Sequence, residues 1–237
     1  MTTSYGNPIA PPREGLVEVR PTFRERSQQR GRTLAPERPH WVDLGFSAAL
    51  VAIALVGFRT GFFGWEWTVA AVGGVVLGLV TAHVTSAFRL PAVVTLLGLA
   101  AAYFLLGGPL ALRGELVAGF IPSGQTFHDL AHTLVHGWKR LLTMLPPVDA
   151  VGPLLALPLI VGLVGAAVTY AVARRWSSPY AVVLAPLALL ALAIVLGTLE
   201  PASVLVQGVL FALLAIGWMV LRAARNRAPL QLSLIHI

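Results

Sequence analysis

Cysteine is absent from the chain, and charged side chains are scarce. Without cysteine the chain forms no disulfide, no thiolate metal site and no cysteine nucleophile. Asp, Glu, Lys and Arg make up 11% of the residues, whereas soluble domains carry about 25%. Because so little charge cannot cover a water-exposed surface, the sequence predicts a protein whose main partner is the lipid bilayer.

The net charge of +7 is concentrated in the N-terminal tail and at the ends of apolar runs. This distribution is typical of the flanks of membrane segments, so we expect no nucleic acid partner. Residues 1–40 are rich in Pro, Arg, Glu, Gln and Ser. Such a composition predicts a disordered, basic tail.

Six apolar runs follow, and each is long enough to cross a hydrocarbon core of about 30 Å as a helix. The runs are 43–59, 64–86, 90–112, 152–174, 179–198 and 201–222. The predicted fold is all-α, with a transmembrane domain of six helices over 41–229. Tryptophans at or near run ends fit the preference of indole for the headgroup layer; they are Trp41, Trp65, Trp67, Trp138, Trp176 and Trp218.

The distribution of Arg and Lys predicts the orientation of these helices. With the tail in the cytoplasm, the inner side holds Arg13, Arg20, Arg24, Arg26, Arg30, Arg32, Arg38, Arg89, Arg174, Arg175, Arg222, Arg225 and Arg227. The outer side holds Arg59, Arg113, Lys139 and Arg140. An inner excess of positive charge predicts a multi-pass protein of the plasma (inner cell) membrane with both ends cytoplasmic.

Small residues in two runs favour close helix contacts. Gly74 and Gly78 form a GxxxG pattern, and Gly162 and Gly165 provide a similar surface in the fourth run. We interpret these glycines as sites of packing within the chain, with a dedicated dimer face as the alternative. Pro186 is expected to kink the fifth helix.

The connection 113–150 contains an amphipathic pattern that predicts a helix over about residues 125–145 in the outer interface. Its apolar positions are Phe127, Leu130, Ala131, Leu134, Trp138, Leu141, Leu142 and Leu145. Thr126 and Asp129 suggest a capping box, and Pro146 and Pro147 end the pattern. We expect Trp138 to anchor this helix.

Three histidines, His128, His132 and His136, recur at a spacing of four on the polar flank of that helix. Such a stripe is compatible with a metal or pH-sensing site, and also with an ordinary polar flank. No Glu completes a metalloprotease motif. We therefore predict an interfacial helix without a functional metal.

The deeper polar side chains are hydroxyls and one amide, which favour hydrogen bonds between helices. They are Thr95, Tyr103, Thr169, Tyr170 and Gln207. The sequence contains no phosphate-binding loop, dinucleotide fingerprint or paired carboxylates. We expect no catalytic residue and no cofactor in this chain.

A specific motif lies at the end of the amphipathic helix: Gly137, Trp138, Lys139, Arg140, Leu141, Leu142 and Thr143, followed by Pro146 and Pro147. Over about residues 40–230 the chain resembles the N-terminal membrane region of actinobacterial transglutaminase-like membrane proteins of the TgpA type. In that family the N-terminal helices precede an extracytoplasmic domain with a Cys-His-Asp triad, and a further membrane helix follows it. No residue here corresponds to the triad.

The resemblance implies a membrane-anchoring domain whose catalytic domain is missing from this chain. That domain would be a partner, as would membrane or cell-envelope proteins. Residues 232–237 look like the translation of an adapter used in DNA library preparation, so we expect the native gene to continue after Gln231 into a seventh helix. The alternatives are a natural hydrophobic C-terminus and a complete six-helix transporter or lipid-handling protein. A third alternative function is a membrane-embedded assembly subunit.

Overall fold

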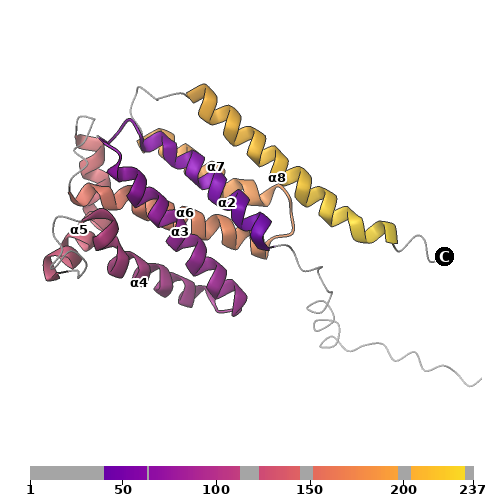
Figure 1. The fold of residues 1–237 in the computed structure, drawn as a ribbon, viewed down its shortest axis with the longest axis horizontal. Helices are drawn as coiled ribbons and strands as arrows, with labels where there is room; N and C mark the ends of the chain where they lie inside the picture. Colours follow the sequence, from indigo (N-terminus) through magenta and orange to yellow (C-terminus); the bar gives the residue numbers. More distant parts are fainter. Residues whose placement is uncertain (1–39, 63, 113–122, 145–151, 197–203, 233–237) are drawn as a thin grey trace, which may run out of the picture. The chain divides into compact units, whose positions relative to one another are not determined.

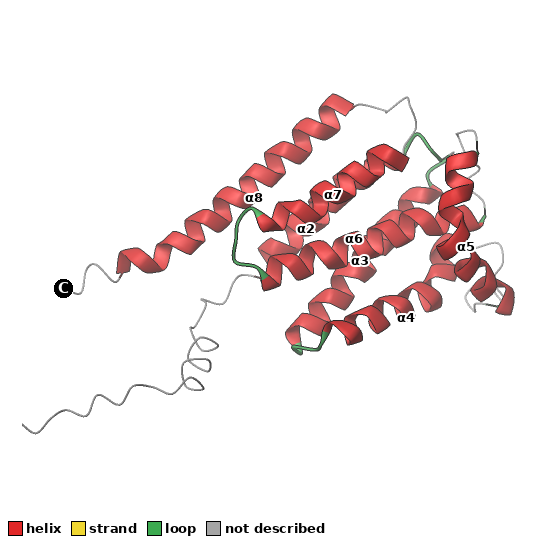
Figure 2. Ribbon diagram, turned by 180° about the vertical axis from the view of Figure 1, so that it is seen from behind, coloured by secondary structure: helices red, strands yellow, loops and turns green. Residues whose placement is uncertain are grey.

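Every described segment of the chain is helical. The computed structural model describes residues 40–62, 64–112, 123–144, 152–196 and 204–232, and this part contains helices and no strand (Figures 1 and 2). The predicted all-α class is therefore confirmed for these residues. The predictions for the tail 1–39, for Pro146 and Pro147 and for residues 233–237 fall outside them.

Seven α-helices and two short 3-10 turns make up the described part. They are α2 (His40–Leu55), η1 (Val56–Phe58), α3 (Glu66–Ala87), α4 (Ala92–Ala111), α5 (Gly124–Thr143), η3 (Pro153–Leu155), α6 (Ala156–Arg175), α7 (Ala181–Leu196) and α8 (Val204–Leu232). The turn η1 continues α2, and η3 leads into α6.

Five helical segments are long and apolar enough to cross a membrane. They are Trp41–Phe58, Glu66–Ala87, Ala92–Ala111, Pro153–Arg175 and Leu205–Asn226. The predicted run 179–198 contains α7, which has 16 described residues. At 1.5 Å per residue those residues span about 24 Å, less than a hydrocarbon core of about 30 Å. The described residues thus support five of the six predicted crossings by length.

Helix α6 is the centre of the bundle, and its principal neighbour is α3. A Cβ atom on Gly74 or Gly78 of α3 would overlap the carbonyl oxygen of Leu159 or Leu163 of α6. On Gly162, a Cβ would lie 2.7 Å from the carbonyl oxygen of Ala71. The two backbones therefore touch, as small residues allow in membrane helices.

Gly165 makes a different contact, with Leu189 of α7. All four predicted packing glycines thus face neighbouring helices of the same chain.

Large apolar side chains cover the outside of the bundle. They include Val72, Val76 and Val80 of α3, Val93, Leu96 and Leu97 of α4, and Leu213, Ile216 and Val220 of α8, all exposed. A surface of this kind is unsuited to water. It fits the lipid environment that the low charge content predicts.

The helices alternate in direction between two ends of the bundle. At one end, which we call the arginine end, lie Arg89, Arg174, Arg175 and Arg222, because α3, α6 and α8 finish there and α2 begins there. The opposite end carries η1, η3 and α5. Figure 2 shows α5 lying across the ends of α4 and α6.

Candidate functional site

A buried ion pair joins the first and last described helices at the arginine end. Asp43 of α2 is 1% exposed and Arg222 of α8 is 4% exposed. The Arg222 Nη1 atom lies 3.4 Å from Asp43 Oδ1, and the fully buried Trp218 donates its Nε1–H to the same oxygen over 3.0 Å. Arg222 Nη2 also donates to the carbonyl oxygens of Ala173 (2.8 Å) and Trp176 (2.9 Å).

These contacts tie α2, α6 and α8 together. A charge in an apolar interior is tolerated only when it is paired and hydrogen-bonded. Here the guanidinium group meets one carboxylate and two carbonyls at the C-terminal end of α6, where helix carbonyls lack partners within the helix. Asp43, Trp218 and Arg222 therefore have a structural role, because their polar atoms bind one another and backbone carbonyls.

Sequence reasoning missed this arrangement. In the predicted runs Asp43 is the first residue of 43–59, Arg222 ends 201–222 on the inner side, and Trp218 lies near a run end. In the structure Trp218 and Trp67 are buried against neighbouring helices, and their depth in the membrane stays a prediction. The available signal was an Asp and an Arg within apolar runs, but their separation of 179 residues hides the pairing in a single sequence.

Other buried or partly buried polar side chains also bind neighbouring helices. His83 of α3 shares a 2.9 Å hydrogen bond with the buried Tyr170 hydroxyl of α6. Tyr103 of α4 donates to the Leu130 carbonyl of α5 over 2.9 Å, and Gln207 of α8 donates to the Ile53 carbonyl of α2 over 2.7 Å. For Tyr103, Tyr170 and Gln207 these bonds agree with the interpretation of the deep polar residues as links between helices.

Thr169 is an exception to that interpretation. Its buried hydroxyl has no hydrogen-bond partner among the described residues.

The N-terminus of α5 differs from the predicted cap. Ser123 is the N-cap residue, and its side chain forms a capping box with Thr126. The predicted box of Thr126 and Asp129 is therefore wrong by three residues, because Ser123 is the hydroxyl residue that lies just before the helix. At the other end the helix stops at Thr143, and Met144 is extended.

The face of α5 that touches the bundle also differs from the predicted apolar face. The buried stripe consists of Thr126, Leu130, Thr133 and Gly137. Among the predicted apolar residues, Trp138 and Leu141 pack partly against the core, whereas Phe127, Leu134 and Leu142 are exposed. Apart from Leu130, the side chains of the stripe are small, which lets α5 lie close to α4 and α6.

Gly137, the first residue of the family-like motif, faces α6. A Cβ at this position would lie 2.8 Å from Thr133 Cγ2 and 3.1 Å from Leu157 Cδ2. The remaining motif residues Trp138, Lys139, Arg140, Leu141, Leu142 and Thr143 form the last two turns of α5. Lys139 and Arg140 are exposed.

The three histidines stack along α5. The ring centroids of His128 and His132 are 6.2 Å apart, and those of His132 and His136 are 4.6 Å apart. Desolvation, followed by the charges of His136, Arg140 and His128, lowers the pKa of His132, and Asp129 partly opposes this.

No group of three metal-ligating side chains converges within the described segments. The predicted absence of a functional metal at the histidines stays a prediction.

Comparison with models of protein families, with curated proteins and with solved structures finds no match to this chain.

Proposed function

We propose that the chain is a membrane domain of six crossings that holds α5 rigidly at the extracytoplasmic surface, where it anchors a transglutaminase-like domain. The observation that supports it most strongly is the contact of Gly137, the first residue of the family-like motif, with Leu157 of α6.

The positions of the two ends of α8 support the proposed sixth crossing. Near its start, Gln207 is bonded to α2 at Ile53, close to η1. Near its end, Asn226 donates to the Ser177 carbonyl over 3.0 Å, just after α6. A chain that leaves α6 at the arginine end must return to the opposite end before α8 begins. Helix α7 takes this path, since Val182 packs with Trp218 and Ala193 lies near Gly57.

The orientation rests on which basic residues share an end. Arg89, Arg174, Arg175 and Arg222 lie at the arginine end, whereas Lys139 and Arg140 belong to α5 at the opposite end. The positive-inside rule therefore favours a cytoplasmic arginine end, with the N-terminus of α2 inside.

Exposed aromatic residues support membrane boundaries at both ends of the bundle. Trp41, Phe88, Trp176 and Tyr180 are exposed at the arginine end, and Trp65 is exposed at the other. Aromatic rings of this kind are enriched in the headgroup layers.

The side chains of α5 suit a position in the outer interface. Beside the stripe that touches the bundle, Phe127, Leu134 and Leu142 form one exposed apolar flank. His128 and Lys139 lie on the side facing away from the bundle, and both are exposed. Apolar residues on one flank and polar residues on another are typical of helices that lie in the headgroup region.

Rigid attachment of α5 can be tested with a matched pair of glycine variants. Gly137→Leu should displace α5, because its side chain would collide with Leu157 of α6. Gly124→Leu is the control on the same helix, since a Cβ there meets nothing within 4 Å. We expect faster hydrogen exchange over residues 124–143 for Gly137→Leu alone. Equal exchange in the two variants would contradict the role of Gly137.

The anchored transglutaminase-like domain is supported by the resemblance of residues 137–143 to the family. A domain outside the cell requires an odd number of crossings before it, so a seventh helix would follow α8. Sequencing the native locus across Gln231 tests this proposal. A frame that continues into about 20 apolar residues and then a domain with Cys, His and Asp supports it. A native stop codon directly after this chain refutes it.

A further inference from the structure

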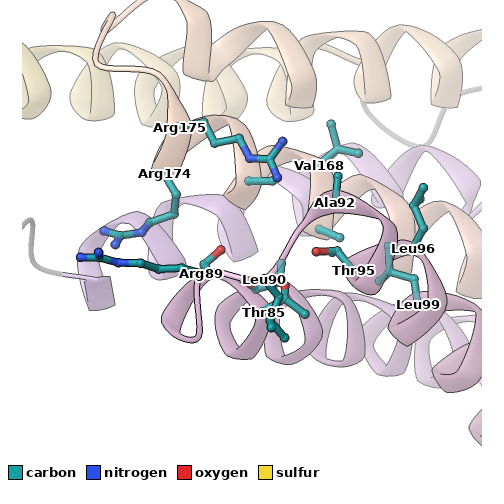
Figure 3. A pocket seen from close by; sticks show the side chains of 14 residues that line it. Thr85, Arg89, Leu90, Ala92, Thr95, Leu96, Leu99, Val168, Arg174 and Arg175 are labelled. Atoms are coloured by element: carbon teal, nitrogen blue, oxygen red, sulfur yellow. Dashed lines mark hydrogen bonds between the residues drawn. The ribbon is translucent and has the colours of Figure 1, made fainter. Parts of the chain in front are cut away.

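We propose that a pocket at the arginine end binds the phosphate headgroup of an anionic phospholipid, with an acyl chain along its apolar wall. The pocket has a volume of about 440 Å³ and lies between α3, α4 and α6. Arg89 enters from the α3–α4 turn, and Arg174 and Arg175 enter from the last turn of α6. In Figure 3, Arg89 and Arg174 extend to the same side, whereas Arg175 extends toward Ala92 and Val168.

The three arginines have no carboxylate partner in the part of the chain that the structure describes. The ion pairs found there are Arg222–Asp43 and His128–Asp129, and neither belongs to the pocket. Three cations around one pocket repel one another unless an anion lies between them. A phosphate group fits them best, because guanidinium groups bind phosphate oxygens through paired hydrogen bonds.

The backbone of the α3–α4 turn adds two features that favour an anion. Helix α4 begins at Ala92, and its N-cap residue, Pro91, makes no side-chain cap hydrogen bond. The partial positive charge of this helix end therefore adds to that of the arginines. Arg89 has φ = 53°, and it is the one non-glycine residue with positive φ in the described segments. In this strained backbone conformation the side chain of Arg89 lines the pocket.

The walls of the pocket distinguish a lipid from a free anion. Leu96 is 65% exposed and Val168 is 46% exposed, and both belong to the lipid-facing surface of the bundle as well as to the pocket. Leu99 extends the apolar wall inward. In a ligand with a phosphate and a hydrocarbon chain, the phosphate binds the arginines and the hydrocarbon chain packs against the apolar wall. Basic pockets between membrane helices are known binding sites for anionic lipid headgroups.

The experiment compares lipids and arginine variants. The purified protein is reconstituted in nanodiscs of phosphatidylcholine with a trace of fluorescent phosphatidylglycerol, and lipid contact is followed by energy transfer from the native tryptophans. We expect saturable binding of phosphatidylglycerol and none of labelled phosphatidylcholine. The double variant R174Q/R175Q should weaken binding at least about tenfold, since each arginine near a lipid surface contributes about 1 kcal/mol.

Arg225→Gln is the matched control, because Arg225 lies near the same end on α8 and does not line the pocket. We expect its affinity to stay within about twofold of the unmodified protein, below the loss for one lipid-contacting arginine. Equal loss in R174Q/R175Q and Arg225→Gln would show general surface attraction and overturn the proposal. Equal binding of phosphatidylcholine would also overturn it.

Inorganic phosphate separates the two sources of the anion. We expect millimolar phosphate to leave phosphatidylglycerol bound, because free phosphate gains nothing from the apolar wall. Ala171→Phe, which fills the pocket and keeps all three arginines, should abolish lipid binding. Displacement by phosphate together with retained binding in Ala171→Phe would identify a simple anion site. The proposal does not depend on the anchored domain, so sequencing the locus and this assay can fail independently.

Discussion

Removal of Arg222 should destabilise the bundle more than any other single change at the arginine end. Arg222→Met keeps most of the side-chain volume but removes the hydrogen bonds to Asp43, Ala173 and Trp176. It also leaves the Asp43 carboxylate buried, with Trp218 as its donor. Breaking a buried ion pair by removing one partner costs about 3–5 kcal/mol. We expect a loss of about 4 kcal/mol in the free energy of unfolding.

Asp43→Asn should cost less, about 2 kcal/mol. The amide oxygen can still accept from Trp218, and the guanidinium group keeps the carbonyls of Ala173 and Trp176. The loss is then close to one hydrogen bond between charged groups, which is worth about 1.5–3 kcal/mol.

A double-mutant cycle separates the pair from other effects of the substitutions. The double variant Asp43→Asn/Arg222→Met leaves no unpaired charge, so it should be more stable than the sum of the single losses by about 2 kcal/mol. Unfolding in mixed micelles of dodecyl sulfate and a mild detergent measures all four proteins. Additive losses, or a loss below about 1 kcal/mol for Arg222→Met, would refute the structural role of the ion pair.

Three further outcomes are expected. Gly78→Ala should lower the free energy of unfolding by about 1–3 kcal/mol, because its Cβ would overlap the Leu163 carbonyl, whereas Gly217→Ala, in open space, should be neutral or slightly stabilising in the same assay. Trp138→Ala should increase proteolysis of α5 more than His132→Ala, since Trp138 packs against the core; the reverse order would contradict this. The pKa of His132 should lie below 6.5 in an NMR titration and rise in Arg140→Gln. Because that folded-state pKa is lowered, acidification below pH 6.5 should destabilise α5, and a midpoint above 6.5 would contradict the local charge arrangement.

The positions of the helices could be predicted largely from the sequence, because lipid permits few alternatives for the backbone. The run 90–112 corresponds to α4 at Ala92–Ala111, and the run 64–86 corresponds to α3 at Glu66–Ala87. The amphipathic pattern 125–145 corresponds to α5 at Gly124–Thr143. In each case the apolar or amphipathic pattern alone predicts the position of the helix.

The contacts between helices could not be predicted in the same way. The face of α5 that contacts the bundle could not be predicted from apolarity, because Phe127, Leu134 and Leu142 are exposed and Gly137 faces α6. The partner of Asp43 lies on α8, and the pocket at the arginine end combines residues from α3, α4 and α6. Such combinations depend on the tertiary arrangement, which periodicity in one segment does not contain.

The proposed topology has six crossings and a cytoplasmic arginine end. Since the chain has no cysteine, single cysteines introduced at exposed positions report their side of the membrane to an impermeant maleimide. The variants are Gln125→Cys in α5, Ser178→Cys between α6 and α7, and Asn226→Cys near the end of α8. In intact cells we predict labelling of Gln125→Cys alone, with the other two labelled only after permeabilisation. Labelling of Asn226→Cys in intact cells, or of Gln125→Cys only after permeabilisation, would contradict this topology.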